Sequence, residues 1–148
     1  LKATDGDVRF GDTKEGCWGI RMIAAFQPDA KLGGSLVNSS GLVNNDAWGK
    51  PADWVDYTGE IAGQKLGIAM MNHPTSFRYP TPWHARGYGL CAANPFGLKG
   101  FDENAADGSH TMAAGESITL SYRLLLHPGD AQEGKVAEIF ADYATQRK

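Results

Sequence analysis

The sequence predicts a mostly β protein, an antiparallel β-sandwich that carries one C-terminal α-helix. Apolar and polar residues alternate along several short segments, as they do in half-buried antiparallel strands. The 19 glycines are spread along the chain rather than clustered, which indicates many turns between short strands. Apolar residues follow a clear helical spacing near the C-terminus. Because 148 residues is a common size for one domain, we expect residues 1–148 to form a single sandwich domain.

Alternation defines two strands best, at residues 64–71 and at residues 117–126. In the second of these, every even-numbered residue is apolar or aromatic. That pattern predicts a buried face that includes Leu124 and Leu126. Shorter strands are expected at residues 17–23, 35–38, 53–57 and 83–92.

One helix is predicted to begin at Asp130. Its carboxylate can accept from the first free backbone N–H groups, and Glu133, three residues later, can complete a capping box. An apolar stripe follows at positions i, i+3, i+4 and i+7, made of Val136, Ile139, Phe140 and Tyr143. We expect this stripe to pack on the sandwich. Residues 97–114 are polar and predict a surface loop of the kind that often handles ligands.

Charge and composition exclude several classes of function. A net charge of −3 gives no basic field, so we expect no nucleic-acid partner. No segment approaches the roughly 18–20 consecutive apolar residues that cross a bilayer, so we expect no membrane partner. The four histidines lack metal-ligand spacing and no phosphate-binding loop is present, so we expect no metal and no cofactor. A metal site assembled from His73, His84 and a distant carboxylate is the weaker alternative.

The cysteines and the N-terminal residues carry information about the cellular compartment. Cys17 and Cys91 show no CxxC spacing, and we expect two buried free thiols, with a disulfide between them as the alternative. The first residues lack the apolar core of a signal peptide. A chain that begins with Leu1 is expected to be processed or to belong to a longer protein, which leaves its localisation open.

The densest group of chemically useful side chains surrounds His84. On a strand through this position, His84, Arg86 and Tyr88 share one face. A neutral imidazole, a fixed cation and a phenol can together transfer a proton beside an anionic group. His73, earlier in the same proline-rich segment, is a further candidate for substrate binding. The alternative is that His84 and Arg86 only satisfy carboxylates within the sandwich.

A second group precedes and enters the strand at residues 17–23. Glu15 lies in a glycine-flanked turn, where a carboxylate can act as a general base. Arg21 points to the opposite face of the strand from Trp18 and is a candidate for holding an anion. Asp12, by contrast, is expected to be a solvated turn residue.

A third group interleaves tryptophans with amides and carboxylates. Flat aromatic rings stack on sugar faces, and polar side chains bind sugar hydroxyls. We therefore expect Trp48 to stack on a ring and Asn45 to bind it, with Asp53 as a candidate carboxylate. On a strand, Asp53 faces away from Asp56, so these two cannot line one pocket. For Trp54, a place in the core is an equally good reading.

Three stretches occur in an order that resembles a known family. They are residues 10–21, the Trp-Gly-Lys and Ala-Asp-Trp-Val-Asp-Tyr runs within residues 38–57, and residues 73–97 with the run Pro-Trp-His-Ala-Arg. Together with residues 115–127, they resemble the C-terminal half of a bacterial family labelled PmoA-like, or "methane oxygenase PmoA". The resemblance implies a domain of undefined function encoded near carbohydrate-handling genes, and a parent protein that is periplasmic or secreted. The last strand also looks similar to the sandwiches of mutarotase-like enzymes.

These groups predict a carbohydrate-active domain that acts on or binds an oxidised or anionic sugar. His84 would be the general acid or base, with Glu15 or Asp53 as its partner carboxylate, and Arg21 and Arg86 would hold the anionic group. Hydrolysis, epimerisation and elimination all use such groups, so the reaction type stays open. The alternatives are a non-catalytic carbohydrate- or protein-binding sandwich and a structural half of a larger fold.

Partners follow from the family resemblance. A half sandwich would leave apolar strand faces and strand edges uncovered, and such surfaces favour association. We therefore expect a homodimer, since two-fold closure is the commonest solution for identical chains, or association with a missing N-terminal half.

Overall fold

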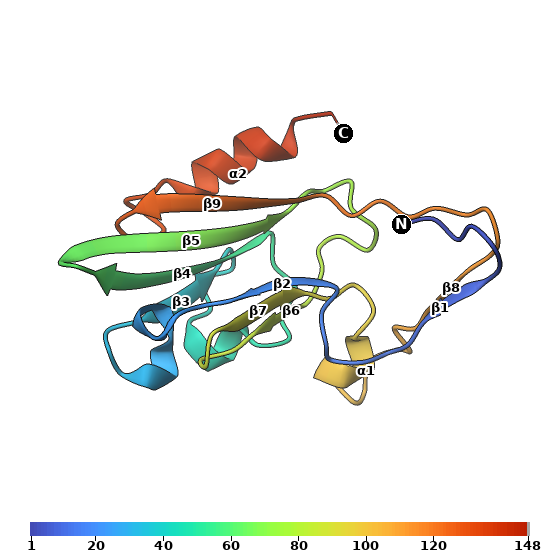
Figure 1. Ribbon diagram of the computed structural model, residues 1–148, viewed down its shortest axis with the longest axis horizontal. Coiled ribbons are helices and arrows are strands. Elements are labelled where there is room, and N and C mark those ends of the chain that lie inside the picture. Colours follow the sequence, from blue (N-terminus) through green and yellow to red (C-terminus); the bar gives the residue numbers. More distant parts are fainter. Residues whose placement is uncertain (148) are drawn as a thin grey trace.

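The computed structural model describes residues 1–147 and is built mainly from antiparallel β-sheets (Figure 1). The first sheet has four strands in the order β3-β4-β5-β9, which span Ser35–Asn38, Trp54–Ile61, Gln64–Asn72 and Tyr122–Pro128. The second sheet has three strands in the order β2-β7-β6, which span Trp18–Arg21, Leu90–Ala93 and Trp83–Ala85. A third sheet pairs β1 (Val8–Phe10) with β8 (His110–Met112) at one end of the molecule.

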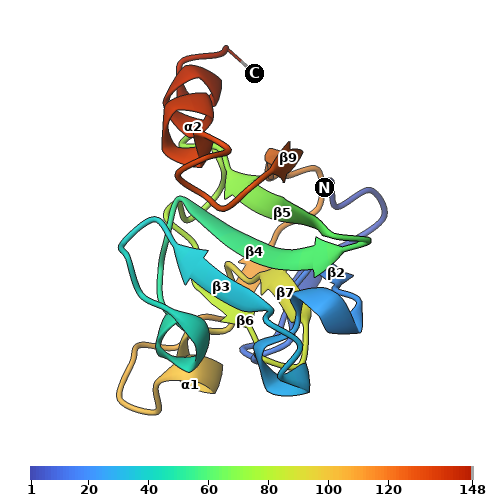
Figure 2. The same ribbon diagram turned by 90° about the vertical axis from the view of Figure 1, so that its left-hand side faces the viewer.

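Helices are few and short. The two α-helices are α1 (Leu98–Phe101) and α2 (Val136–Ala144), and three 3-10 segments are η1 (Ala24–Phe26), η2 (Pro28–Ala30) and η3 (Asn44–Ala47). Neither α-helix in residues 1–147 is long and apolar enough to span a bilayer. α2 lies on the outer face of the first sheet, and the second sheet packs against the opposite, inner face of the first sheet (Figures 1 and 2). The predicted mostly β sandwich with one C-terminal helix is confirmed.

The two central strands of the first sheet, β4 and β5, are buried on both faces over much of their length. The core between the two sheets includes Tyr57, Met70 and Trp83, none of which is exposed. The core under α2 includes Met71 and Tyr143. The alternation along residues 64–71 predicted one buried face for β5. Its other face is buried too, because α2 covers it.

Residues 83–92 form two strands instead of one. β6 and β7 pair as a hairpin, and the turn between them is closed by a hydrogen bond from Gly89 N to Arg86 O at 2.8 Å. Gly89 has a φ of 92°, a conformation that side chains with a Cβ rarely adopt. This turn carries Arg86 and Tyr88 at the end of the hairpin.

β9 begins at Tyr122, later than expected, and its even-numbered face is not fully covered. Leu124 is 45% exposed and Leu126 is 69% exposed. Met70, which pairs with Leu124 across the strands, is fully buried. β9 is the edge strand of a four-stranded sheet, and the opposing sheet has only three strands (Figure 2). The prediction that Leu124 and Leu126 are buried is wrong, because no strand of the smaller sheet covers them.

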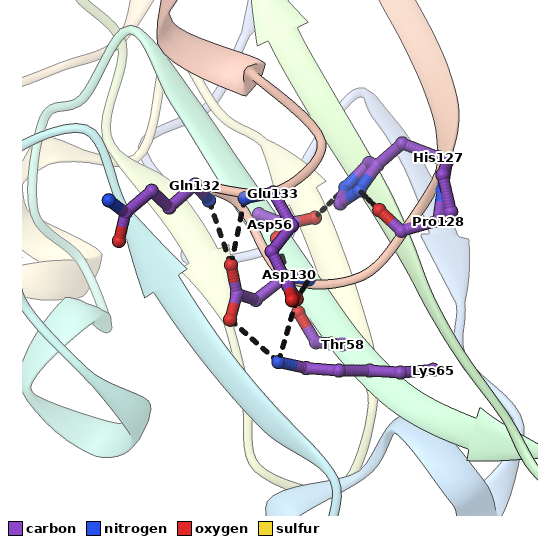
Figure 3. A network of polar contacts seen from close by, with 8 residues as sticks. All are labelled: Asp56, Thr58, Lys65, His127, Pro128, Asp130, Gln132 and Glu133. Atoms are coloured by element: carbon purple, nitrogen blue, oxygen red, sulfur yellow. Dashed lines mark hydrogen bonds and ion pairs between the residues drawn. The ribbon is translucent and has the colours of Figure 1, made fainter.

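A buried polar pair connects β9 to β4 (Figure 3). His127 Nε2 lies 3.0 Å from Asp56 Oδ1, within hydrogen-bond distance, and both side chains are at most 3% exposed. Burial raises the pKa of Asp56, while hydrogen bonds from His127 and Thr58 act in the opposite direction. The His127 ring lies between Gly67 and Gly134, where a Cβ at either glycine would come to 2.1 Å from a ring atom.

The capping box at Asp130 forms, but α2 begins later, at Val136. Asp130 Oδ1 accepts from Glu133 N at 3.0 Å, and Asp130 N donates to Glu133 Oε2 at 2.9 Å. Lys65 of β5 pairs with both carboxylates (Figure 3). Lys135 has a left-handed φ of 51°, so helical geometry does not run from the box into α2. The apolar stripe of α2 packs on the sheet as predicted.

Both cysteines are free thiols in the described chain. Cys91 is buried in β7, as expected, whereas Cys17 is exposed. Burial raises the pKa of the Cys91 thiol, and partial removal of the Cys17 sulfur from water raises its pKa as well, so neither is poised to react as a thiolate.

Candidate functional site

A pocket of about 200 Å³ gathers most of the predicted site residues. The residues that line it are Lys14, Glu15, Trp48, His84, Arg86 and Tyr88. Backbone hydrogen bonds explain how distant segments meet, since Gly49 N donates to Trp83 O at 2.8 Å and Trp83 N donates to Lys50 O at 3.3 Å. These bonds set Trp48 beside β6, the strand that carries His84.

His84 is the most buried member of this pocket, with 3% of its surface exposed. Its Nδ1 lies 2.7 Å from the carbonyl oxygen of Lys14. Because a carbonyl only accepts, Nδ1 carries the proton, and Nε2 of a neutral ring is left as an acceptor. Nε2 lies 3.5 Å from the hydroxyl of Tyr88. The ring is therefore oriented to exchange a proton at Nε2.

Two arginines flank Tyr88 without an acidic partner. The guanidinium carbon of Arg86 lies 5.2 Å from the centre of the Trp48 ring and 5.4 Å from the centre of the Tyr88 ring. That of Arg21 lies 5.7 Å from the Tyr88 ring, although Arg21 itself does not line the pocket. Within residues 1–147, neither arginine forms an ion pair. Contacts with aromatic rings position a cation without neutralising it, so this side of the pocket favours an anion.

Trp48 also lines a neighbouring cleft of about 600 Å³. The ring of Phe101, from α1, lies 5.4 Å from the Trp48 ring and 6.1 Å from the His84 ring. Asn45, from η3, lines this cleft and not the smaller pocket. The predicted sugar-binding pair of Trp48 and Asn45 therefore meets in the larger cleft.

The segment that carries Phe101 is anchored on both sides. Asp12 accepts hydrogen bonds from three backbone N–H groups, those of Lys99, Gly100 and Gly108. Burial alone would raise the pKa of Asp12, but these donors outweigh it and the pKa is lowered. Arg78 donates to three backbone carbonyls, those of Pro95, Gly108 and Ser109. The prediction that Asp12 is a solvated turn residue is wrong, because its carboxylate holds this loop.

Besides Arg21 and Asn45, two further predicted site residues lie outside the pocket. Asp53 accepts a hydrogen bond from the Tyr79 hydroxyl and does not line the pocket. His73 is 1% exposed, and its ring packs against Tyr143 of α2. Asp53 immediately precedes β4 and His73 immediately follows β5, so both lie beside the first sheet, whereas His84 belongs to the second. The expected pairing of His84 with Asp53 therefore does not form. Among residues 1–147, no group of three or more His, Cys, Asp or Glu is arranged to hold a metal ion.

Sequence reasoning missed two contributors to the site. Lys14 provides the carbonyl oxygen that sets the tautomer of His84, and a backbone group leaves no mark in the residue type. Phe101 was not singled out, although residues 97–114 were expected to handle a ligand. The one phenylalanine in this stretch was the available signal.

A family model covers residues 1–141 of the chain, and its description is a family of unknown function (DUF6807). The chain belongs to this family. No curated protein and no solved structure matches it. The resemblance to the PmoA-like family stays a prediction, and the function has to be argued from the geometry of the pocket.

Proposed function

We propose that the pocket binds the carboxylate-bearing ring of an oxidised or anionic sugar. The observation that carries this proposal is the guanidinium of Arg86, which contacts the rings of Trp48 and Tyr88 and forms no ion pair within residues 1–147. A cation held in this way and partly shielded from water offers charge-assisted hydrogen bonds to a carboxylate. Arg21, beside the same Tyr88, adds to the positive field.

Aromatic rings at the same pocket favour a sugar over other anions. Trp48 lines the pocket, and Phe101 meets it at an interplanar angle of 82°, which leaves rings in two orientations around the cavities. A sugar presents apolar C–H faces to such rings and hydroxyl groups to polar neighbours. Glu15, which also lines the pocket, is an acceptor for hydroxyl groups.

His84 is the proposed proton-transfer group. Its Nδ1 proton is held by Lys14 O, so Nε2 can accept a proton from a bound ring or return one to it. Proton transfer of this kind occurs in hydrolysis, epimerisation and elimination, and the products formed would distinguish these reactions.

A non-catalytic sugar-binding domain is the second candidate. In residues 1–147, the polar partners of the His84 ring are Lys14 O and the Tyr88 hydroxyl, and no carboxylate is hydrogen-bonded to it. An imidazole that acts as a base is commonly oriented by a carboxylate. The absence of that contact favours binding without turnover.

The test is calorimetric titration with methyl glucuronide and with methyl glucoside, which differ only in the carboxylate. We expect the wild-type protein to prefer the glucuronide. Arg86→Gln should lower that affinity about tenfold or more, because a charge-assisted hydrogen bond contributes about 1.5–3 kcal/mol. The matched control is Arg9→Gln, at an exposed arginine of β1 that does not line the pocket. Equal affinity for the two sugars, or no effect of Arg86→Gln, would overturn the proposal.

A further inference from the structure

We infer that the binding site continues past Trp48 into the 600 Å³ cleft, so that the ligand is an acidic oligosaccharide of at least two rings. This inference rests on the function proposed above for the smaller pocket. In this arrangement, the carboxylate-bearing ring lies at Arg86 and the adjoining, uncharged ring lies in the cleft.

The sizes of the two cavities point to an extended ligand. The pocket at His84 has a volume of about 200 Å³. Sites for small molecules usually measure about 300–1,000 Å³, so this pocket alone is small for a complete ligand. The neighbouring cleft of about 600 Å³ brings the pair of cavities into that range.

One aromatic wall joins the cavities. Trp48 lines both of them, and its ring contacts His84 on the pocket side and Phe101 on the cleft side. The contact between Trp48 and Phe101 requires a glycine at position 49, because a Cβ there would come to 2.9 Å from Phe101 Cβ. Since Asp12 and Arg78 anchor the loop that carries Phe101, this wall is in place before a ligand arrives.

The charges of the two cavities differ, and this difference sets the direction in which the oligosaccharide binds. The residues that line the pocket include two basic ones, Arg86 and Lys14, and one acidic one, Glu15. The cleft presents two carboxylates, Asp46 and Asp102, beside Lys50. A second acidic ring in the cleft would meet like charge, whereas the hydroxyl groups of a neutral ring can donate to these carboxylates.

The test compares methyl glucuronide with two disaccharides that join one glucuronate to one glucose, with the acid at either end. We expect the better of these disaccharides to bind at least tenfold more tightly than the monosaccharide. A disaccharide of two glucuronates should lose that gain. If neither mixed disaccharide binds more tightly than methyl glucuronide, the inference is overturned and the proposed function stands. If methyl glucuronide itself does not bind, the proposed function fails.

Two variants locate the second ring. Ala105→Trp should fill the cleft at a half-exposed position and reduce disaccharide affinity to that of the monosaccharide. Phe101→Ala should have the same effect by removing part of the wall. Ala113→Trp, at an exposed position after β8, is the matched control for added bulk and should leave both affinities unchanged. If Ala105→Trp left the disaccharide gain intact, the ligand would not enter the cleft.

Discussion

His84 shows how much of a residue's chemistry depends on a backbone neighbour. The hydrogen bond to Lys14 O sets the tautomer, and the turn after β6 brings the Tyr88 hydroxyl near Nε2. Sequence alternation predicted that His84 and Arg86 share one face of a strand, and both do line the pocket, but β6 ends at Ala85 and Arg86 lies in the turn after it. Tyr88 reaches the same pocket by a turn instead of a continuous strand, so its place was predicted for the wrong reason.

The two roles of His84 can be separated by substitution. His84→Asn keeps an N–H group near the position of Nδ1 and removes Nε2, so we expect stability within about 1 kcal/mol of wild type but loss of proton transfer. His84→Ala leaves Lys14 O without its donor and should cost about 1–3 kcal/mol. Urea unfolding and product analysis with the preferred sugar measure these effects. Unchanged turnover in His84→Asn, if the protein is an enzyme, would assign the residue a structural role.

At the scale of elements, β9 and α2 are held by contacts that alternation does not reveal. His127 lies one residue beyond the strand predicted at residues 117–126, and its ring is buried against Asp56. The stripe of α2 was predictable because helical spacing is local. The start of α2 was not, because the left-handed Lys135 separates the capping box from the helix.

The His127–Asp56 contact should be sensitive to the glycine opposite it. Gly67 pairs with His127 across the strands, and a Cβ there would overlap the ring. Gly67→Ala should displace His127 and cost about 3 kcal/mol or more, since breaking a buried polar pair leaves one partner without the other. Denaturant unfolding measures this loss. Gly6→Ala, where a Cβ meets nothing within 4 Å, is the control, and a similar small effect in both variants would contradict the prediction.

For the whole molecule, the uneven sheets leave an apolar surface at one edge. Exposed Leu126 borders a groove of about 500 Å³ between β2 and the strands β5 and β9, which Ile23 and Ile61 also line. β9 is an unpaired edge with its proline at the last position, so little prevents another strand from pairing with it. Pairing of β9 with the same strand of a second copy, about a two-fold axis at Leu125, would set exposed leucines against each other.

We therefore expect the protein to form a homodimer through β9, as the sequence led us to predict. Leu126→Glu should place like charges on both sides of the two-fold axis and shift the protein to monomer in sedimentation experiments at micromolar concentration. Leu32→Glu is a matched control, because Leu32 is 63% exposed and lies in a loop away from β9. A wild-type protein that sediments as a monomer would contradict the prediction.

The sequence by itself determined the fold class, the two longest strand patterns and the apolar stripe of α2, because each depends on side chains close together in the chain. It also identified five residues by their chemistry as site candidates that line the pocket: Glu15, Trp48, His84, Arg86 and Tyr88. Only the tertiary structure decided that Asp53 turns to Tyr79 and that Phe101 meets Trp48. It alone decided that Leu126 stays exposed. These outcomes depend on which sheet a segment joins and on how many strands cover it, and no local pattern records either.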